Sequence, residues 1–216
     1  MKMRISEESP RKNYDKKVTL SSACRDKCIP EICFCETGEL LKNGGFETPS
    51  FNPNELFAGW RLHSITPNTI DFVRDTENVY KGSTAASVRT TQQAGPAVLV
   101  LRQYVDVTPG CLYRLKFAER LVAFNQTTDR VPLLIASLVY LDRVLNEYEL
   151  LSIYIQKKKA DAEYYLHEQT ADFPVPCNVP GIIVQFSFFT TDTPGSVWNL
   201  DAVSLRAVSK ASACCL

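Results

Sequence analysis

Most of the chain consists of short segments in which apolar and polar residues alternate, and this pattern predicts β-strands. Between residues 113 and 117, Tyr, Leu and Phe alternate with Arg and Lys, so one face of that strand is expected in a core and the other in solvent. Gly, Pro, Asn and Asp separate the segments, and no stretch has a convincing helical period. The sequence therefore predicts an all-β sandwich of about eight to ten antiparallel strands. The other segments that we expect to be strands cover residues 70–74, 85–89, 97–101, 133–141, 150–155, 164–167, 182–188 and 197–205.

Two stretches enclose this β-region. The first is Asn43-Gly44-Gly45-Phe46-Glu47, in which the glycines permit a tight turn, Phe46 can close the end of the core and Glu47 stands at the expected start of the first strand. The second runs from Val197 to Leu205 and alternates around Asp201. Because the first and last strands of a closed sandwich commonly lie side by side, we expect Glu47 and Asp201 to meet.

These two stretches and two internal motifs resemble a known family. The motifs are Asn43 to Glu47, Val79-Tyr80-Lys81-Gly82-Ser83, the turn Val107-Thr108-Pro109-Gly110 and the closing Leu200-Asp201-x-Val203-Ser204-Leu205. In this order they resemble the jelly-roll domains of the galactose-binding-like superfamily. That superfamily includes many carbohydrate-binding modules, and a close variant stands at the N-terminus of collagen-like surface proteins of spore-forming Firmicutes.

The resemblance implies a jelly-roll domain over residues 39–208, with an extended, cysteine-rich N-terminal arm (residues 1–38) and a short cysteine-containing C-terminal tail (residues 209–216). It also implies a structural calcium ion, which in many of these modules ties the first strand to the last. Glu47 and Asp201 are then the side-chain ligands, and carbonyl groups near Lys81 and Gly82 assist them. The family often has a second aspartate after the first, where this chain has Ala202. The alternative is a strand pair that faces solvent without a metal, so no cofactor is required.

Composition argues against several classes of function. The 216 residues include 24 basic and 24 acidic side chains, and this zero net charge gives no field that would attract nucleic acid or an anionic membrane. No apolar run approaches the roughly 20 residues of a membrane span, and the charged N-terminus does not look like a secretory signal peptide. The histidines, His63 and His167, lie in strand-like segments, and no catalytic motif is present, so an enzyme is not expected. The Lys157-Lys158-Lys159 run predicts a solvated turn.

Eight cysteines are many for a chain of this size, and most of them lie outside the β-region. We predict that they form disulfides between subunits, because a framework that supports a core would be spread through the domain. One alternative is an internal Cys111–Cys177 bridge, since both residues are expected at strand ends. Another is zinc binding by the arm, although its spacings lack paired Cys-x-x-Cys knuckles. The cysteines are Cys24, Cys28, Cys33 and Cys35 in the arm, Cys111 and Cys177 in the domain, and Cys214 and Cys215 in the tail.

The arm contains one β-prone stretch, Val18-Thr19-Leu20, which is suited to pairing with an exposed sheet edge of this subunit or another. A flexible tail is the alternative. A domain with cysteines at both ends can be linked to one neighbour at each end. Head-to-tail contacts that do not close into a ring produce an open filament. Our leading hypothesis is therefore a homo-oligomeric structural subunit of a disulfide-linked extracellular fibre or coat. We place it on the bacterial endospore surface, where proteins made in the mother cell need no signal peptide. This plan is similar to that of endospore appendage subunits.

The alternative function is a carbohydrate-binding module that recognises a surface or cell-wall glycan. Such a module needs exposed aromatic side chains on a sheet face or at a loop rim. Trp60 is expected in the core instead, because large aromatic side chains are usually buried. The aromatic candidates that the sequence does not assign to a face are Tyr104, Tyr140, Tyr154, Tyr164, Tyr165 and Trp198.

Overall fold

The computed structural model describes residues 35, 37–52, 55–66, 69–91, 97–124, 131–142, 144–190 and 195–210. This part of the chain contains ten strands, which is within the predicted range of about eight to ten. Most of the expected segments are longer in the structure, and those expected over 97–101 and 164–167 begin one residue later. It holds no helix that is long and apolar enough to cross a membrane. The strands are β1 (Arg61–Ile65), β2 (Ile70–Asp75), β3 (Ala85–Thr90), β4 (Val98–Asp106), β5 (Cys111–Ala123), β6 (Leu133–Leu141), β7 (Glu147–Gln156), β8 (Tyr165–Thr170), β9 (Gly181–Phe189) and β10 (Val197–Lys210).

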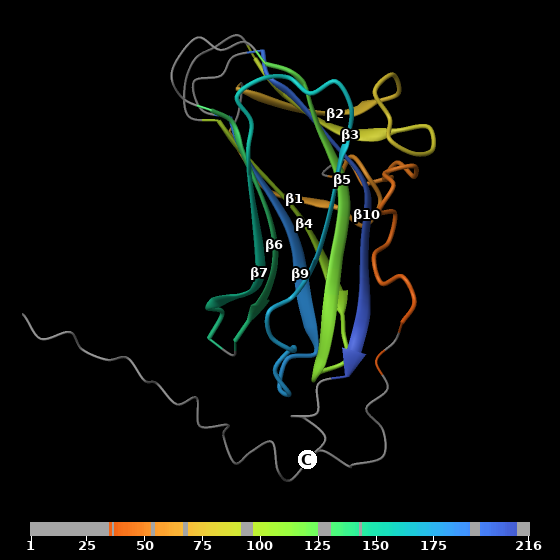
Figure 1. Cartoon of the computed structure of the whole chain (residues 1–216), viewed down its shortest axis with the longest axis vertical. Helices are drawn as coiled ribbons and strands as arrows, with labels where there is room; N and C mark the ends of the chain where they lie inside the picture. The colour runs from red at the N-terminus through yellow and green to blue at the C-terminus, as the bar shows by residue number, and fades with distance from the viewer. Residues whose placement is uncertain are drawn as a thin grey trace, which may run out of the picture.

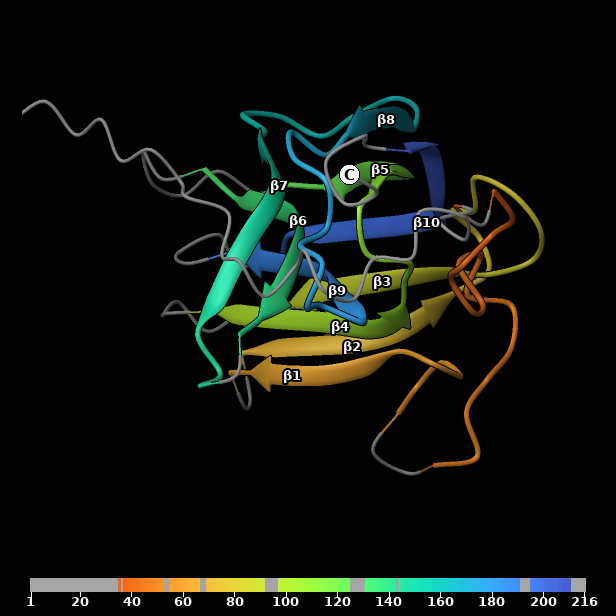
Figure 2. The same ribbon diagram turned by 90° about the horizontal axis from the view of Figure 1, so that it is seen from below.

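The strands form two five-stranded sheets, and every pair of neighbours is antiparallel (Figure 1). The first, which we call the β4–β9 sheet, has the order β1-β4-β9-β6-β7, and the second, the β5–β10 sheet, has the order β2-β3-β10-β5-β8. Figure 2 shows the edge strands β1 and β2 on one side of the sandwich and β7 and β8 on the other. It also shows β6 and β7 rotated relative to β1 and β4 of the same sheet, which is the twist expected across a β-sheet. The predicted all-β jelly-roll sandwich is confirmed.

The core closes at the turn before β1. Phe46, Phe57 and Trp60 are all but fully buried, and the Phe46 ring lies 5.0 Å from that of Phe57 and 5.2 Å from that of Trp60, centroid to centroid. The Trp60 indole donates a hydrogen bond of 3.0 Å to the Asn43 carbonyl. Phe46 and Trp60 are therefore core residues, as the sequence predicts.

The segment before that turn runs along β10. The Leu40 amide donates to the Leu205 carbonyl (3.1 Å), and the Val203 amide donates to the Gly44 carbonyl (2.8 Å). Any side chain at Gly44 would collide with the Val203 carbonyl oxygen, so glycine is required for this approach. The expectation that Glu47 begins the first strand is wrong, because the first strand of the sheets begins at Arg61 and a coil segment lies against the last strand instead.

Candidate functional site

The outer face of the β4–β9 sheet carries a set of polar and aromatic side chains. Along β4, Leu99, Leu101 and Val105 are buried in the core, so the alternate residues of that strand point outward. The same alternation holds on β9, β6 and β7, and the pairing register places outward residues of neighbouring strands side by side. These outward residues include Arg102 and Tyr104 on β4, Gln185 and Ser187 on β9, Ser137 on β6, and Ser152 and Tyr154 on β7.

Tyr104 and Tyr154 are the exposed aromatic residues of this face. Tyr104 is 61% exposed and Tyr154 is 65% exposed. A side chain at Gly181 would collide with the Tyr104 ring, so the ring lies on the bare backbone of β9. The register places Tyr104 opposite Ile183 of β9, which in turn lies opposite Val139 of β6. Tyr154 lies opposite Ile135 of β6, four residues from Val139 along that strand. With strand spacings of about 4.8 Å and rises of about 3.4 Å per residue, the two rings stand roughly 20 Å apart, diagonally across the sheet.

A polar network lies between the two tyrosines. The Arg102 guanidinium donates to Gln185 Oε1 (2.5 Å) and to Glu147 Oε1 (2.7 Å), and the Gln185 amide donates to Ser187 Oγ (3.0 Å). The Arg102 side chain is only 17% exposed, so these contacts hold its planar end in a fixed orientation. The face thus combines exposed aromatic rings with the fixed polar groups of Arg102 and Gln185, while Ser137 and Ser187 are buried. Aromatic rings and planar polar groups suit a ligand that has apolar faces and many hydroxyl groups.

Glu47 and Asp201, the predicted calcium ligands, line one groove on the other sheet. Glu47 accepts hydrogen bonds from the amide (2.9 Å) and hydroxyl (2.5 Å) of Ser83 and more weakly from Thr84, and those from Ser83 lower the pKa of its carboxyl. Asp201 accepts from the amides of Tyr80 (2.9 Å) and Lys81 (3.0 Å). Burial raises the pKa of Asp201, and the nearby Glu47 charge adds to this rise.

The surroundings of Asp201 partly fit a hard cation. Its carboxyl group is fully buried, and no basic side chain pairs with it in the described part of the chain. However, amides rather than carbonyls of Tyr80 and Lys81 point at it, and the described residues contain no group of three His, Cys, Asp or Glu side chains placed to hold a metal. Calcium binding by Glu47 and Asp201, with backbone or water oxygens as the remaining ligands, therefore stays a prediction.

The disulfide prediction is wrong for two of the eight cysteines. Cys35 and Cys111 form a disulfide within the chain, with their Cα atoms 5.8 Å apart, because the segment before Leu40 runs back along β10 and ends near the start of β5. Cys35 therefore supplies no thiolate for zinc. Cys177 is also disulfide-bonded, and since Cys111 is bound to Cys35 the internal Cys111–Cys177 alternative is wrong as well. Cys24, Cys28, Cys33, Cys214 and Cys215 lie outside the described residues, as do Val18, Thr19 and Leu20.

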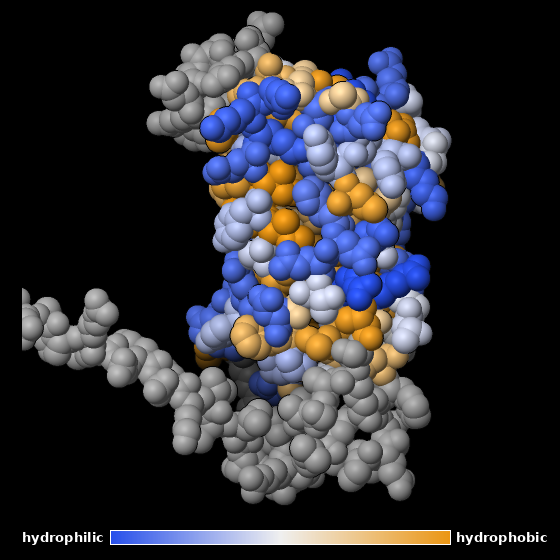
Figure 3. Space-filling model, in the orientation of Figure 1, coloured by the Kyte–Doolittle hydropathy of each residue, from blue (hydrophilic) through white to orange (hydrophobic). Residues whose placement is uncertain are grey.

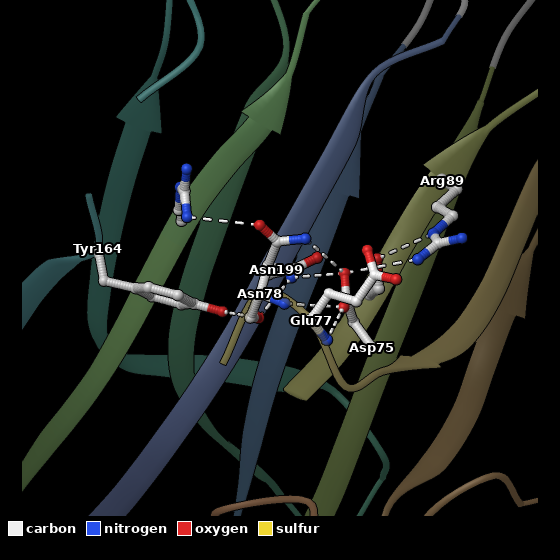
Figure 4. A network of polar contacts seen from close by, with 8 residues as sticks. Asp75, Glu77, Asn78, Arg89, Tyr164 and Asn199 are labelled. Carbon is white, nitrogen blue, oxygen red and sulfur yellow. Dashed lines mark hydrogen bonds and ion pairs between the residues drawn. The ribbon is translucent and has the colours of Figure 1, made fainter. Parts of the chain in front are cut away.

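The loop of residues 76–84 is held over the outer face of the β5–β10 sheet by a polar network that the sequence does not reveal (Figure 4). Asp75, at the end of β2, accepts hydrogen bonds from the amides of Glu77 (2.9 Å) and Asn78 (3.0 Å) and from the side chain of Asn199 (3.0 Å). Despite its burial, these bonds lower the pKa of Asp75 to about 2. The Tyr164 hydroxyl donates to the Asn78 carbonyl (2.7 Å). This network sets the position of Tyr80 and Lys81.

A second buried network contains one of the predicted surface lysines. Glu119 is fully buried and accepts from the Trp198 indole (2.7 Å), and it pairs with Lys157 (2.8 Å) and His167 (3.1 Å). Lys157 also pairs with Asp161 (2.8 Å), and its side chain is only 13% exposed. The prediction of a solvated turn is therefore wrong for Lys157. Because every partner of Glu119 is a donor that satisfies a buried charge, the cluster stabilises the fold.

The structure places the remaining aromatic candidates away from the β4–β9 face. Trp198 is fully buried, Tyr140 is partly buried and stacks on Tyr148 with centroids 5.2 Å apart, and Tyr164 bonds to Asn78. Tyr165 is exposed on β8 of the other sheet, where Lys157 lies 3.9 Å from its ring centroid. Only Tyr104 and Tyr154 of the six therefore share the candidate face.

Comparisons with known proteins agree with this fold. No protein-family model matches the chain, and no curated protein matches it. Among solved structures it is similar to TmCBM61 in complex with β-1,4-galactotriose, with a TM-score of 0.53 and 21% identity over 79% of this chain and 99% of that one. It is also similar to the tandem CBM22-1-CBM22-2 domain of Paenibacillus barcinonensis Xyn10C, with a TM-score of 0.53 and 12% identity over 83% of this chain and 49% of that one. The enzymatically active domain of bacteriophage CBA120 tailspike protein 4 gives a TM-score of 0.55 and 17% identity, but the match covers only 21% of that chain. The fold is thus the jelly roll of carbohydrate-binding modules.

Proposed function

We propose that the protein binds a glycan chain on the outer face of the β4–β9 sheet. The observation that carries the proposal is the pair of exposed rings, Tyr104 and Tyr154, with the fixed Arg102–Gln185–Ser187 network between them. Sugar rings have apolar faces that pack on aromatic side chains, and their hydroxyl groups exchange hydrogen bonds with planar polar groups. The separation of roughly 20 Å corresponds to about four linked pyranose units, so the chain would cross the strands diagonally.

The charges of this face favour a neutral glycan. Arg102 is paired with Glu147, and the outward Asp106 and the exposed Glu149 form no ion pair within the described residues. A polymer of uronic acids would meet these unpaired carboxylates and be repelled. The similar structure of TmCBM61 holds the neutral β-1,4-galactotriose, which supports the same ligand class here.

The test is binding of neutral β-linked oligosaccharides, measured by isothermal titration calorimetry on a panel of galacto-, xylo- and gluco-oligomers of increasing length. We expect affinity to rise up to about four units, and Tyr104→Ala and Tyr154→Ala each to weaken binding about tenfold. Phe173→Ala is the matched control, because Phe173 is 67% exposed but lies in the loop between β8 and β9. Equal loss in the control, or no binding of any neutral oligomer by the wild-type protein, would refute the proposal.

The fibre hypothesis concerns other parts of the chain. Apart from the disulfide-bonded Cys177, its remaining cysteines lie outside the described residues, as does its assembly strand, and its endospore location rests on the sequence resemblance alone. Glycan binding is the better supported function because it rests on side chains whose positions are described and on the fold of known glycan-binding modules. Binding in such modules needs no catalytic group, so we propose a binding protein rather than an enzyme.

A further inference from the structure

The opposite sheet has a groove of its own, on its outer face over β10, β5 and β8. It has a volume of about 730 Å³ and is walled on one side by the loop of residues 76–84. In Figure 3, hydrophilic side chains cover most of the surface over β5 and β10, with smaller apolar patches between them. The charged residues that the argument uses are Lys81 from the loop, Arg114 and Lys116 from β5, Glu168 from β8, Arg206 from β10 and Glu39.

The carboxylates of this groove already have their hydrogen bonds. Glu39 accepts from the Ser204 hydroxyl (2.5 Å), the Leu205 amide (2.8 Å) and Arg206 Nε (3.3 Å). Glu168 is shared by Arg114 (2.8 Å) and Lys116 (3.3 Å). Together with the satisfied Glu47 and Asp201, the groove has little acceptor capacity to offer a ligand.

Its basic side chains, by contrast, have N–H donors to spare. Arg114 and Arg206 each use only part of the guanidinium group, and Lys81 makes no side-chain hydrogen bond or ion pair within the described chain. The register places Arg206 directly opposite Arg114, and like charges in this arrangement destabilise a sheet. Their exposed ion pairs are weak and can rearrange when a stronger acceptor arrives. The groove therefore favours a ligand rich in anionic oxygens.

Apolar surface at the rim fits a sugar ring. Tyr80 is 45% exposed, and its ring is backed by Tyr164 at 5.5 Å between centroids. Leu166 on β8 is 47% exposed and also lines the groove. An anionic ligand without a carbon skeleton would leave these side chains without a contact.

From these observations we propose that this groove is a second saccharide site, specific for an acidic glycan whose carboxylate groups contact Arg114, Arg206 and Lys81. Arginine binds carboxylates through two parallel hydrogen bonds, and two adjacent arginines suit consecutive uronic acid units. The site lies on the sheet opposite Tyr104 and Tyr154 and does not depend on the function proposed for that face. Binding at both faces would let one domain connect a neutral and an acidic glycan.

The experiment is calorimetric titration with trigalacturonate and, as a neutral probe of the same rings and linkage, its fully methyl-esterified form. We expect binding of the acid only, weakened as salt is raised. Arg206→Gln and Lys81→Gln should each weaken it about tenfold, since each removes charge-assisted hydrogen bonds. Lys158→Gln, an exposed lysine outside the groove, is the control, and Tyr104→Ala should leave acid binding unchanged.

Three results would overturn the proposal: equal binding of the methyl ester, wild-type affinity in both groove variants, or loss of acid binding in Tyr104→Ala. Direct binding of inorganic phosphate without any binding of trigalacturonate would also overturn it, because the groove would then recognise an ion and not a saccharide. Thermal unfolding of each variant shows whether it is folded. The Arg206→Gln variant should have about the stability of the wild-type protein, because loss of the weak, exposed ion pair with Glu39 is offset by relief of the like-charge pair with Arg114.

Discussion

Replacing Asp75 with Asn tests the network that holds the loop of residues 76–84. Asp75 is 4% exposed and accepts hydrogen bonds from Glu77, Asn78 and Asn199, with Arg89 at 3.4 Å. An asparagine keeps one acceptor oxygen but turns an NH₂ group towards donors, so buried N–H groups lose their partner.

The pKa of Asp75 gives the size of the expected change in the free energy of unfolding. A carboxyl whose pKa falls from 3.8 to about 2 on folding contributes about 2.4 kcal/mol of stability at neutral pH. Because the folded pKa is the lower one, this contribution is present above pH 3.8 and disappears as the pH falls towards 2. We therefore expect Asp75→Asn to lower the free energy of unfolding by about 2 to 3 kcal/mol at pH 7 and the difference from wild type to shrink between pH 4 and 2.

The assay is urea unfolding followed by tryptophan fluorescence at a series of pH values. Asp71→Asn is the matched control, since Asp71 lies on the same strand and is exposed. It should change stability by less than about 0.5 kcal/mol at every pH. A difference between Asp75→Asn and wild type that stays constant down to pH 2 would refute the reasoning, because the loss would then not come from the ionised carboxylate.

Three further predictions concern the links of the domain. Replacing Cys35 and Cys111 with serine should lower the free energy of unfolding by about 4.5 kcal/mol in urea unfolding, because the disulfide spans 76 positions; wild-type protein in reductant should lose at least as much, since Cys177 is disulfide-bonded as well. Calcium should raise the melting temperature of the wild-type protein but not of Glu47→Gln, and an equal rise in both would exclude Glu47 as a ligand. The subunit-linking disulfides that remain predicted should give a ladder on a non-reducing gel that collapses to 24.3 kDa with reductant, whereas a monomer band without reductant would contradict the fibre hypothesis.

The fold was predictable from the sequence because the pattern that indicates a strand lies within the strand itself. Alternation along a strand such as Cys111–Ala123 depends on one face being buried, and the structure buries Tyr113, Leu115 and Phe117 while leaving Arg114 outside. Phe46 and Trp60 were predictable for a similar reason, since large aromatic side chains are the residues that a core of this size most needs.

The site was less predictable because it depends on long-range register. Nothing near Tyr104 in the sequence indicates that it lies across the sheet from Tyr154, since the strands between them come from residues 133–141 and 181–189. Glu119 and Lys157 illustrate the same limit, because each looks like a surface charge until the fold brings them to 2.8 Å. The only local signal for such buried charges is the position of Glu119 on the apolar side of its strand, in phase with Leu115 and Phe117.

Glycan binding and self-assembly make separate demands on this chain. The two faces proposed to bind saccharides belong to opposite sheets of one sandwich, whereas the predicted assembly elements lie in the arm and the tail. The Cys35–Cys111 disulfide fixes the start of the described chain to β5, so an arm that crosses to a neighbour would pull on the sandwich itself. A polymer built in this way would present both faces along its length, and many weak sites on one particle would bind a glycan layer far more tightly than a single domain. Comparing the reduced and oxidised protein on immobilised glycan therefore separates the two functions. If disulfides link subunits, reduction should lower the avidity, and the affinity of each domain in solution should stay unchanged as long as the sandwich remains folded without its Cys35–Cys111 disulfide.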